Sequence, residues 1–574
     1  DGWRRQKDRG TRARAALLGA AAAAAPGACV SSHGVPAAAA PASPRWRLRR
    51  AARADITRPR HCARRRTGQH ADIRCARRQF ARPQWRNSAD IRRRHRQHLG
   101  DKLRVRVGEE PRLAENLLGV VLRHHLPLLR HHPSLAMWCG NNEVSEGWAR
   151  WGWKDGLTND EISDIQSSYD KIFEELLPSI VAEFDDAPYW SSSPSLGRGD
   201  SDFVKWGDAH DWGIWHDGYS FDSLWTRVPR FMSEFGFQSF PEKSTWETVV
   251  PDAQFTRESE AVIAHEKHSR GFDIIDSYLN ETHGNGFENL PYEEWSYLTQ
   301  VIQAKGISDG VKAARLNQDF CSGSLVWQLN DCWPVASWSS IDAHGKWKLL
   351  HHSLKTAFAP TLLFGRWNTE GRKPVLEVGL VSNPTREKSK EIPGILRVSV
   401  VGFNGEEISV SEHPFNLTPG KPAWTELENI LSRKVDPTQS FIQLSWNDNA
   451  CEVDTSNCQP SARAVVWAVL PKDLNLDQTE ITVRNGPEMY SENNSTKHII
   501  ESPVFAKDVQ LTCNASGNFN INGFDLLPGE KKTVIFTPHK LETWAPEFSK
   551  SGTSHLPHSR FLIQAMSLNT ILGE

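Results

Sequence analysis

Cysteine, methionine and tyrosine are scarce in this sequence, which holds 9 Cys, 4 Met and 7 Tyr among 574 residues. The cysteines form no CxxC pair and no other metal-ligand spacing, so the sequence gives no support to a metal site. Cys451 and Cys458 are near enough to close a short loop in an oxidising compartment. Hydrophobic runs are also short, and none approaches the ~20 residues that cross a bilayer. We therefore expect no bound metal and no membrane insertion.

Glutamate is absent from residues 1–100, and the net charge of the chain changes sign after that stretch. This stretch has 24 Arg and one Lys against five Asp, a charge of +20, whereas the remainder carries −21. One folded body rarely divides its charge in this way. Residues 1–105 also lack helical or strand periodicity and consist of tracts such as RWRLRRAARA at 45–54. We predict that residues 1–105 are disordered, or translated from a frame that is not the native one.

Two other interpretations of this basic segment stay open. The stretch LLGAAAAAAPGA follows a basic start, as in a secretory signal peptide. Arginine clusters also attract phosphate, as in a nucleic-acid-binding arm, although we expect no nucleic-acid partner. Five N-x-S/T sequons mildly favour a secretory route, and they lie at Asn280, Asn416, Asn493, Asn494 and Asn514.

Residues 106–360 alternate short apolar strands with helices, which is typical of a parallel α/β sheet or barrel. We expect strands at 135–139, 205–210, 230–234 and 323–329, a strand end at 188–193, and helices at 113–128, 161–184 and 292–316. Polar residues gather just past the strand ends: Asn142, Glu143, Ser191 to Ser193, His210, Glu234, Asn330 and Asp331. In a (β/α)₈ TIM barrel that edge carries the chemistry, so the sequence predicts part of such a barrel.

After residue 360 the pattern becomes all-β. Strand-like segments lie at 375–378, 397–401, 441–446 and 532–536, with turn-rich linkers between them. We predict one β-sandwich domain at 361–462 and a second, immunoglobulin-like β-sandwich at 463–574. The expected fold class is therefore α/β followed by all-β.

Tryptophan is abundant, and 15 of the 23 Trp lie between Trp138 and Trp347. The flat indole face suits the C–H faces of a sugar ring, but a Trp-rich core explains the same density. Two glutamates add to the sugar hypothesis, because hydrolysis of a glycoside with retention needs two carboxyls about 5–5.5 Å apart. Glu143 and Glu234 both follow expected strands, so a barrel would bring them to the same edge.

Four ordered motifs resemble glycoside hydrolase family 2, in its β-mannosidase branch. HPSLAMWCGNNE (132–143) is similar to the strand-four acid/base motif, and RFMSEFGFQSFP (230–241) to the strand-seven nucleophile motif. GDAHDWGIW (207–215) resembles the strand-six motif, and GSLVWQLNDCWPVASWSSID (323–342) resembles strand eight and its loop. The β-galactosidases of the family share the plan, but SEFGFQSFP and LNDCWPVASW favour the mannosidase branch.

The resemblance implies a retaining β-mannosidase without a cofactor. Glu143 would be the acid/base, Glu234 the nucleophile, and Asn142 the hydrogen-bond partner of the sugar 2-hydroxyl. His210 would contact Glu234 or the sugar. Four tryptophans would form the walls of the terminal-sugar pocket: Trp151, Trp212, Trp327 and Trp333. The implied substrate is a β-mannoside oligosaccharide or an N-glycan core, and the implied location is secreted, lysosomal or vacuolar, with a homodimer as one possible state.

The chain departs from the family plan before the strand-four motif. Three strand–helix units would need about 100 residues of such pattern, and the Arg-rich segment shows none of it. We therefore expect a truncated or mistranslated chain. The alternatives to an active β-mannosidase are an inactive remnant with at most glycan binding, or a sibling enzyme such as an exo-β-glucosaminidase or endo-β-mannosidase.

Overall fold

The computed structural model describes residues 27–30, 111–250, 255–257, 259–368, 373–384, 390–431, 435–448, 461–486, 495–539 and 562–573. The predicted basic segment therefore lies outside the described residues, except that Gly27–Val30 form strand β1. Cys451, Cys458, Asn493 and Asn494 also lie outside them. Among the helices that are described, none has the length and apolar character needed to cross a membrane.

Two compact units make up the structure, and the smaller takes in residues 111–136 and 165–187. It is helical, with α3 (Pro111–Leu129), the π-helix η2 (Asp170–Leu176) and α6 (Leu177–Phe184), the last two continuing α5 (Asn159–Tyr169). Leu126 and Ile180 are fully buried, and Arg123 pairs with Glu183 at 2.6 Å. The predicted helix at 161–184 is thus confirmed, with a π-helical segment inside it.

The larger unit contains five short strands that pair in parallel among the residues that the structure describes. β2 (Leu135–Cys139), which begins in the smaller unit, pairs with β3 (Tyr189–Trp190), and β1 joins the same sheet. β5 (Met232–Phe235) lies between β4 (Ala209–His210) and β6 (Ser324–Val326) in a second sheet. Parallel pairs with intervening helices give the mixed α/β character that the sequence predicts, and closure into a barrel stays a prediction.

The predicted strand at 205–210 is wrong in its first half. Residues 205–207 form a turn, and β4 holds only Ala209 and His210. The cause is local, because Gly207 has φ +63°, which lies outside extended backbone. The predicted strand at 323–329 is likewise shorter and ends at Val326. Residues 327–329, which follow β6, therefore form a loop at the carboxyl end of that strand.

Helices cover the second sheet and bury an aromatic core. α12 (Tyr292–Leu316) matches its predicted range and is buried on nearly every side, including Trp295, Leu298 and Ile307. A helix that is buried all round lies inside its domain. The other helices are α4 (Val144–Arg150), α7 (Gly213–His216), α8 (Ser223–Thr226), α9 (Lys243–Trp246), α10 (Glu260–Ala264), α11 (Gly271–Thr282), η4 (Phe287–Asn289) and α13 (Leu349–Ala357).

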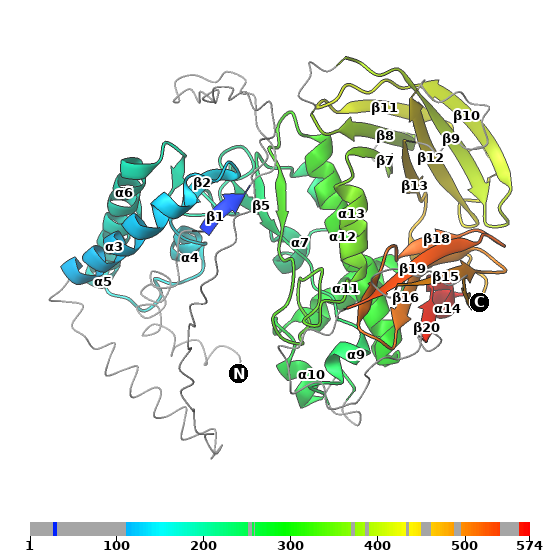
Figure 1. Ribbon diagram of the computed structural model, residues 1–574, viewed down its shortest axis with the longest axis horizontal. Helices are drawn as coiled ribbons and strands as arrows, with labels where there is room; N and C mark the ends of the chain where they lie inside the picture. Colours follow the sequence, from blue (N-terminus) through cyan, green and yellow to red (C-terminus); the bar gives the residue numbers. More distant parts are fainter. Residues whose placement is uncertain are drawn as a thin grey trace, which may run out of the picture. The chain divides into compact units, whose positions relative to one another are not determined.

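A β-sandwich follows, with two facing antiparallel sheets (yellow-green in Figure 1). One sheet has the order β10-β9-β12-β13 and the other β11-β8-β7. Leu380 from β8 and Val398 from β9 belong to the single core between them. The bounds are β7 (Thr361–Asn368), β8 (Val375–Ser382), β9 (Gly394–Gly402), β10 (Glu407–Pro414), β11 (Ala423–Glu428), β12 (Ser440–Asp448) and β13 (Ala462–Val466). Because β13 pairs with β12, this sandwich continues past its expected limit at 462.

A second β-sandwich ends the chain (orange to red in Figure 1), with sheet orders β14-β15-β19-β17 and β18-β16-β20. Phe536 of β19 and Leu511 of β16 are fully buried in its core. The bounds are η5 (Pro471–Asp473), β14 (Thr482–Asn485), β15 (Thr496–Glu501), β16 (Ala506–Cys513), β17 (Gly517–Phe519), β18 (Phe524–Leu526), β19 (Lys532–Pro538), β20 (Ile563–Met566) and α14 (Leu568–Leu572).

Candidate active site

Glu143, His210 and Glu234 meet at the ends of three strands of the larger unit. One carboxylate oxygen from each glutamate and a ring nitrogen of His210 all lie within 4.8 Å of one another. His210 Nδ1 lies 2.8 Å from Glu143 Oε1 and 2.6 Å from Glu234 Oε2. Glu143 and Glu234, which are 91 positions apart in sequence, therefore face the same imidazole nitrogen.

The backbone explains why these three side chains converge. His210 and Glu234 are paired residues on the adjacent parallel strands β4 and β5, so their side chains lie next to each other. Glu143 follows β2, and its backbone N–H donates to Ser193 O at 2.8 Å, just past β3. Glu143 has φ 59° and ψ 10°, a left-handed conformation that is costly for a residue with a side chain. Such strain gathers at functional sites, which makes Glu143 a candidate for one.

The two carboxylates differ in how they meet His210. The contact with Glu143 has hydrogen-bonding geometry, whereas Glu234 Oε2 is buried close to Nδ1 without a directed hydrogen bond. Burial alone would lower the pKa of His210, but the hydrogen bond that Nδ1 makes to Glu143 and the negative charges of Glu234 and Glu143 raise it to about 9. His210 is therefore held as an imidazolium at neutral pH.

A buried carboxylate lies behind His210. Asp208 accepts hydrogen bonds from Ser195 N at 2.7 Å, Ser193 Oγ at 2.5 Å and Ser233 Oγ at 2.7 Å. Ser193 Oγ also lies 3.0 Å from His210 Nε2. Asp208, Ser193 and His210 thus form a continuous hydrogen-bond chain that ends at Glu143. Neither Ser193 nor Asp208, which lies directly before β4 and two residues from His210, was predicted to have a role.

The two asparagines before Glu143 have different environments. Asn141 is buried: its Nδ2 donates to Ser191 O at 2.7 Å, and its Oδ1 accepts from Val144 N and Ser192 Oγ. Asn142 is exposed beside Ser193, with which it forms a parallel β-bridge. Asn141 therefore holds the strand ends together, and the exposed amide of Asn142 remains the predicted ligand for a sugar hydroxyl.

The four predicted wall tryptophans are not equivalent. Trp212 is buried and packs on Trp338, with ring centroids 5.7 Å apart. Trp327 directly follows β6 and is 44% exposed, and its backbone N–H donates to Phe235 O. The ring contacts of Trp151 and Trp333 are to Trp153 and His265. Trp327 is thus tied to the strand that carries Glu234. A substrate role for all four tryptophans stays a prediction.

Gly236 allows β6 to approach the segment that follows Glu234. A Cβ at this position would lie 2.2 Å from the Trp327 carbonyl oxygen, 3.2 Å from Trp338 and 3.3 Å from Trp212. The carbonyl cannot move without displacing β6. We expect Gly236→Ala to lower the free energy of unfolding by about 1–3 kcal/mol, the usual cost of overpacking, measured by urea denaturation.

Gly119→Ala is a suitable control for that substitution. Its new Cβ would lie 3.1 Å from the flexible guanidinium of Arg123, within a helix interior where Ala is favoured over Gly. Equal stability of Gly236→Ala and the unmodified protein would show that β5 and β6 do not approach so closely.

The loop after β6 is organised by Asp331. Its two carboxylate oxygens accept hydrogen bonds from Ser337 Oγ at 2.6 Å and Ser339 Oγ at 2.5 Å. Between these serines, Trp338 reaches the rings of Trp212 and Trp215. Asp331 therefore holds the loop, and Trp338, which had no predicted role, lies beside Gly236.

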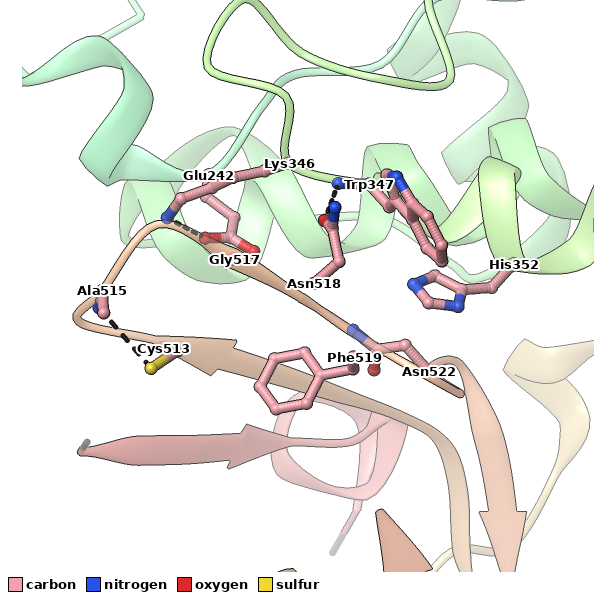
Figure 2. A pocket seen from close by; sticks show the side chains of 10 residues that line it. All are labelled: Glu242, Lys346, Trp347, His352, Cys513, Ala515, Gly517, Asn518, Phe519 and Asn522. Atoms are coloured by element: carbon pink, nitrogen blue, oxygen red, sulfur yellow. Dashed lines mark hydrogen bonds and ion pairs between the residues drawn. The ribbon is translucent and has the colours of Figure 1, made fainter. Parts of the chain in front are cut away.

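A small cavity lies where this loop meets the second sandwich (Figure 2). Lys346 Nζ pairs with Glu242 at 2.9 Å, and Asn518 Oδ1 accepts from Trp347 N at 2.9 Å. The space available is only about 10 Å³, enough for about one water molecule. A sugar does not fit, so the glutamate site remains the candidate.

Glu143, His210 and Glu234 have the residue types that also suit a divalent cation. The hydrogen bond and ion pair at His210 Nδ1 already account for their grouping. We therefore assign no metal to them.

Comparison with known proteins identifies the class of the second sandwich. Residues 476–553 match the family model Ig_mannosidase, described as an Ig-fold domain.

β-Mannosidase B of Neosartorya fischeri is 34% identical over 433 residues, which cover 71% of this chain and 48% of that protein. β-Mannosidase B of Thermothelomyces thermophilus is 33% identical over 258 residues, which cover 40% of this chain and 28% of that protein.

Solved structures show the same fold. The β-D-mannosidase of Dictyoglomus thermophilum has a TM-score of 0.61 at 24% identity, covering 80% of this chain and 51% of that one. The exo-chitosanase of Amycolatopsis orientalis has a TM-score of 0.52 at 12% identity, covering 79% and 53%.

These similarities confirm the resemblance that the motifs indicate. The chain is a relative of the β-mannosidases of glycoside hydrolase family 2, with an Ig-like domain and mixed α/β structure. It spans about half the length, or less, of the curated relatives that it matches.

Proposed function

We propose that the protein is a retaining glycoside hydrolase that releases terminal β-D-mannose from β-mannosides. The observation that carries the proposal is the placement of two carboxylate oxygens within 4.8 Å, close to the ~5–5.5 Å carboxyl separation of retaining enzymes. Inverting enzymes need about 6.5–9.5 Å, because a water molecule must fit between sugar and base.

The two glutamates take different roles because their surroundings differ. Glu234 is the more buried, and its Oε2 has no directed hydrogen bond, so its lone pairs are available to attack the anomeric carbon. Glu143 is partly exposed and hydrogen-bonded to His210, so it can protonate the leaving oxygen. Water then cleaves the mannosyl–Glu234 ester as Glu143 takes up a proton from it.

Mannose specificity is proposed from the relatives and from Asn142. Curated β-mannosidases match over 71% of the chain. Asn142 is exposed directly before Glu143, where an amide can bond the axial 2-hydroxyl of mannose. Trp212 and Trp327 would supply walls beside Glu234. The substrate would be a β-mannoside oligosaccharide or an N-glycan core, and a secreted, lysosomal or vacuolar location remains part of the proposal.

A substrate panel tests this choice against the sibling activities. We expect p-nitrophenyl β-mannoside to give the highest kcat/KM, above the β-glucosaminide and β-galactoside, with the same rates before and after treatment with EDTA. A preference for the β-glucosaminide would favour the activity of the exo-chitosanase, whose fold is similar. No hydrolysis of any member would favour an inactive relative.

A further inference from the structure

The hydrogen-bond chain behind His210 fixes where protons can lie. The Ser193 hydroxyl has one proton, and it lies 2.5 Å from Asp208 Oδ2 and 3.0 Å from His210 Nε2. Asp208 already accepts from Ser195 N and Ser233 Oγ, as a carboxylate does. If Ser193 donated to His210 instead, two oxygens 2.5 Å apart would face each other without a proton. Ser193 therefore donates to Asp208 and accepts from His210 Nε2–H.

A fixed proton on Nε2 leaves Nδ1 as the variable atom of His210. The titratable groups that face it are Glu143, from the end of β2, and Glu234, from β5. Two ionised carboxylates cannot both face a bare nitrogen lone pair, so one proton must lie among these three groups. The Nδ1 contact with hydrogen-bonding geometry is to Glu143, and the shared proton therefore lies between His210 and Glu143.

We propose that Asp208 and Ser193 are positioning residues that hold His210 in its Nε2–H form, so that Nδ1 stores the acid proton for Glu143. The catalytic use of that proton rests on the proposed glycosidase function. In the first step the Nδ1–H bond breaks and a Glu143 O–H bond forms across the 2.8 Å contact. Glu143 then gives this proton to the leaving oxygen as Glu234 bonds to the anomeric carbon. In the second step water returns a proton to Glu143, and Nδ1 recovers it.

The charges balance through this cycle. The resting site carries two carboxylates and one imidazolium, and the glycosyl-enzyme carries one carboxylate, a neutral imidazole and a neutral ester. The net charge of −1 is the same in both states. The raised pKa of His210, about 9, agrees with a proton that is held until the ester forms and removes the charge of Glu234.

Asp208→Asn tests the proposal with little change in shape. The amide oxygen can still accept from Ser195 N, and Ser233 Oγ has Ala209 O as another acceptor at 3.3 Å. The new amide N–H would donate to Ser193, which would then donate to Nε2. His210 would become the neutral Nδ1–H form, and it could not give up that proton without becoming an anion.

The direct measurement is ¹⁵N NMR of histidine-labelled protein between pH 6 and 10, with His210→Gln to assign one signal among 22 histidines. We expect two protonated ring nitrogens at neutral pH and the Nε2–H form after deprotonation. Asp208→Asn should give the Nδ1–H form. Ser193→Ala, which removes the link, should lose the Nε2–H preference, whereas Ser233→Ala, which removes a different donor to Asp208, should keep it. A neutral Nδ1–H form in the unmodified protein would overturn the proposal.

The catalytic consequence has its own readout. Asp208→Asn should lower kcat/KM about 10²-fold on an alkyl β-mannoside and change it little on 2,4-dinitrophenyl β-mannoside, which needs no acid. The alkaline limb of the pH profile of kcat/KM should also shift in Asp208→Asn, because the group that supplies the proton has changed. Equal losses on both substrates would indicate a structural role and contradict the positioning role. An unmodified protein that hydrolyses neither substrate would refute the proposed function, while the NMR result would still decide the state of His210.

Discussion

Glu234→Ala is expected to reduce kcat by roughly 10⁴- to 10⁶-fold, the scale of losing a covalent nucleophile. Glu234 is held in β5 opposite His210, and its buried Oε2 is the oxygen placed to attack. Removing the carboxylate leaves a space on the α face of the sugar. Azide should enter it and restore turnover of 2,4-dinitrophenyl β-mannoside, with α-mannosyl azide as the product.

Glu247→Ala is the matched control, because Glu247 is an exposed glutamate just after α9. It should keep the activity of the unmodified protein. Rate rescue without an α-configured azide, or no rescue at any azide concentration, would assign the nucleophile to another residue.

Glu143→Ala is expected to lower kcat/KM by about 10²- to 10⁴-fold on alkyl β-mannosides, the usual contribution of a general acid. Good leaving groups depart without protonation, so 2,4-dinitrophenyl β-mannoside should still form the glycosyl-enzyme. Azide should then attack that intermediate from the opposite side and give β-mannosyl azide. The two variants should thus give azides of opposite configuration, and a shared configuration would contradict the assigned roles.

Local structure follows closely from sequence in two segments near the site. The bounds of β2 and α12 match their predictions, because β2 is a short run of apolar residues and α12 is a long helical pattern that the protein buries along most of its length. β4 was mispredicted since Gly207 turns the chain, and glycine can adopt either sign of φ. The π-helical segment η2 also has no signature in the residues that form it.

The candidate site was only partly predictable. Motif order placed Glu143, His210 and Glu234 at strand ends, but which atoms meet depends on register and on the left-handed turn at Glu143. The roles of Ser193 and Asp208 could not be predicted, because serine and aspartate form hydrogen bonds throughout proteins. Only the tertiary contacts join these two residues to His210. Trp338 was overlooked for a similar reason, since tryptophan is common throughout this region.

The stereochemistry of the first sugar released tests the pairing of the two glutamates most directly. ¹H NMR of p-nitrophenyl β-mannoside hydrolysis, recorded faster than mutarotation, should show β-mannose appearing before its α anomer. Release of α-mannose first would mean a single displacement by water, which two carboxylates this close to one imidazole nitrogen could not accommodate.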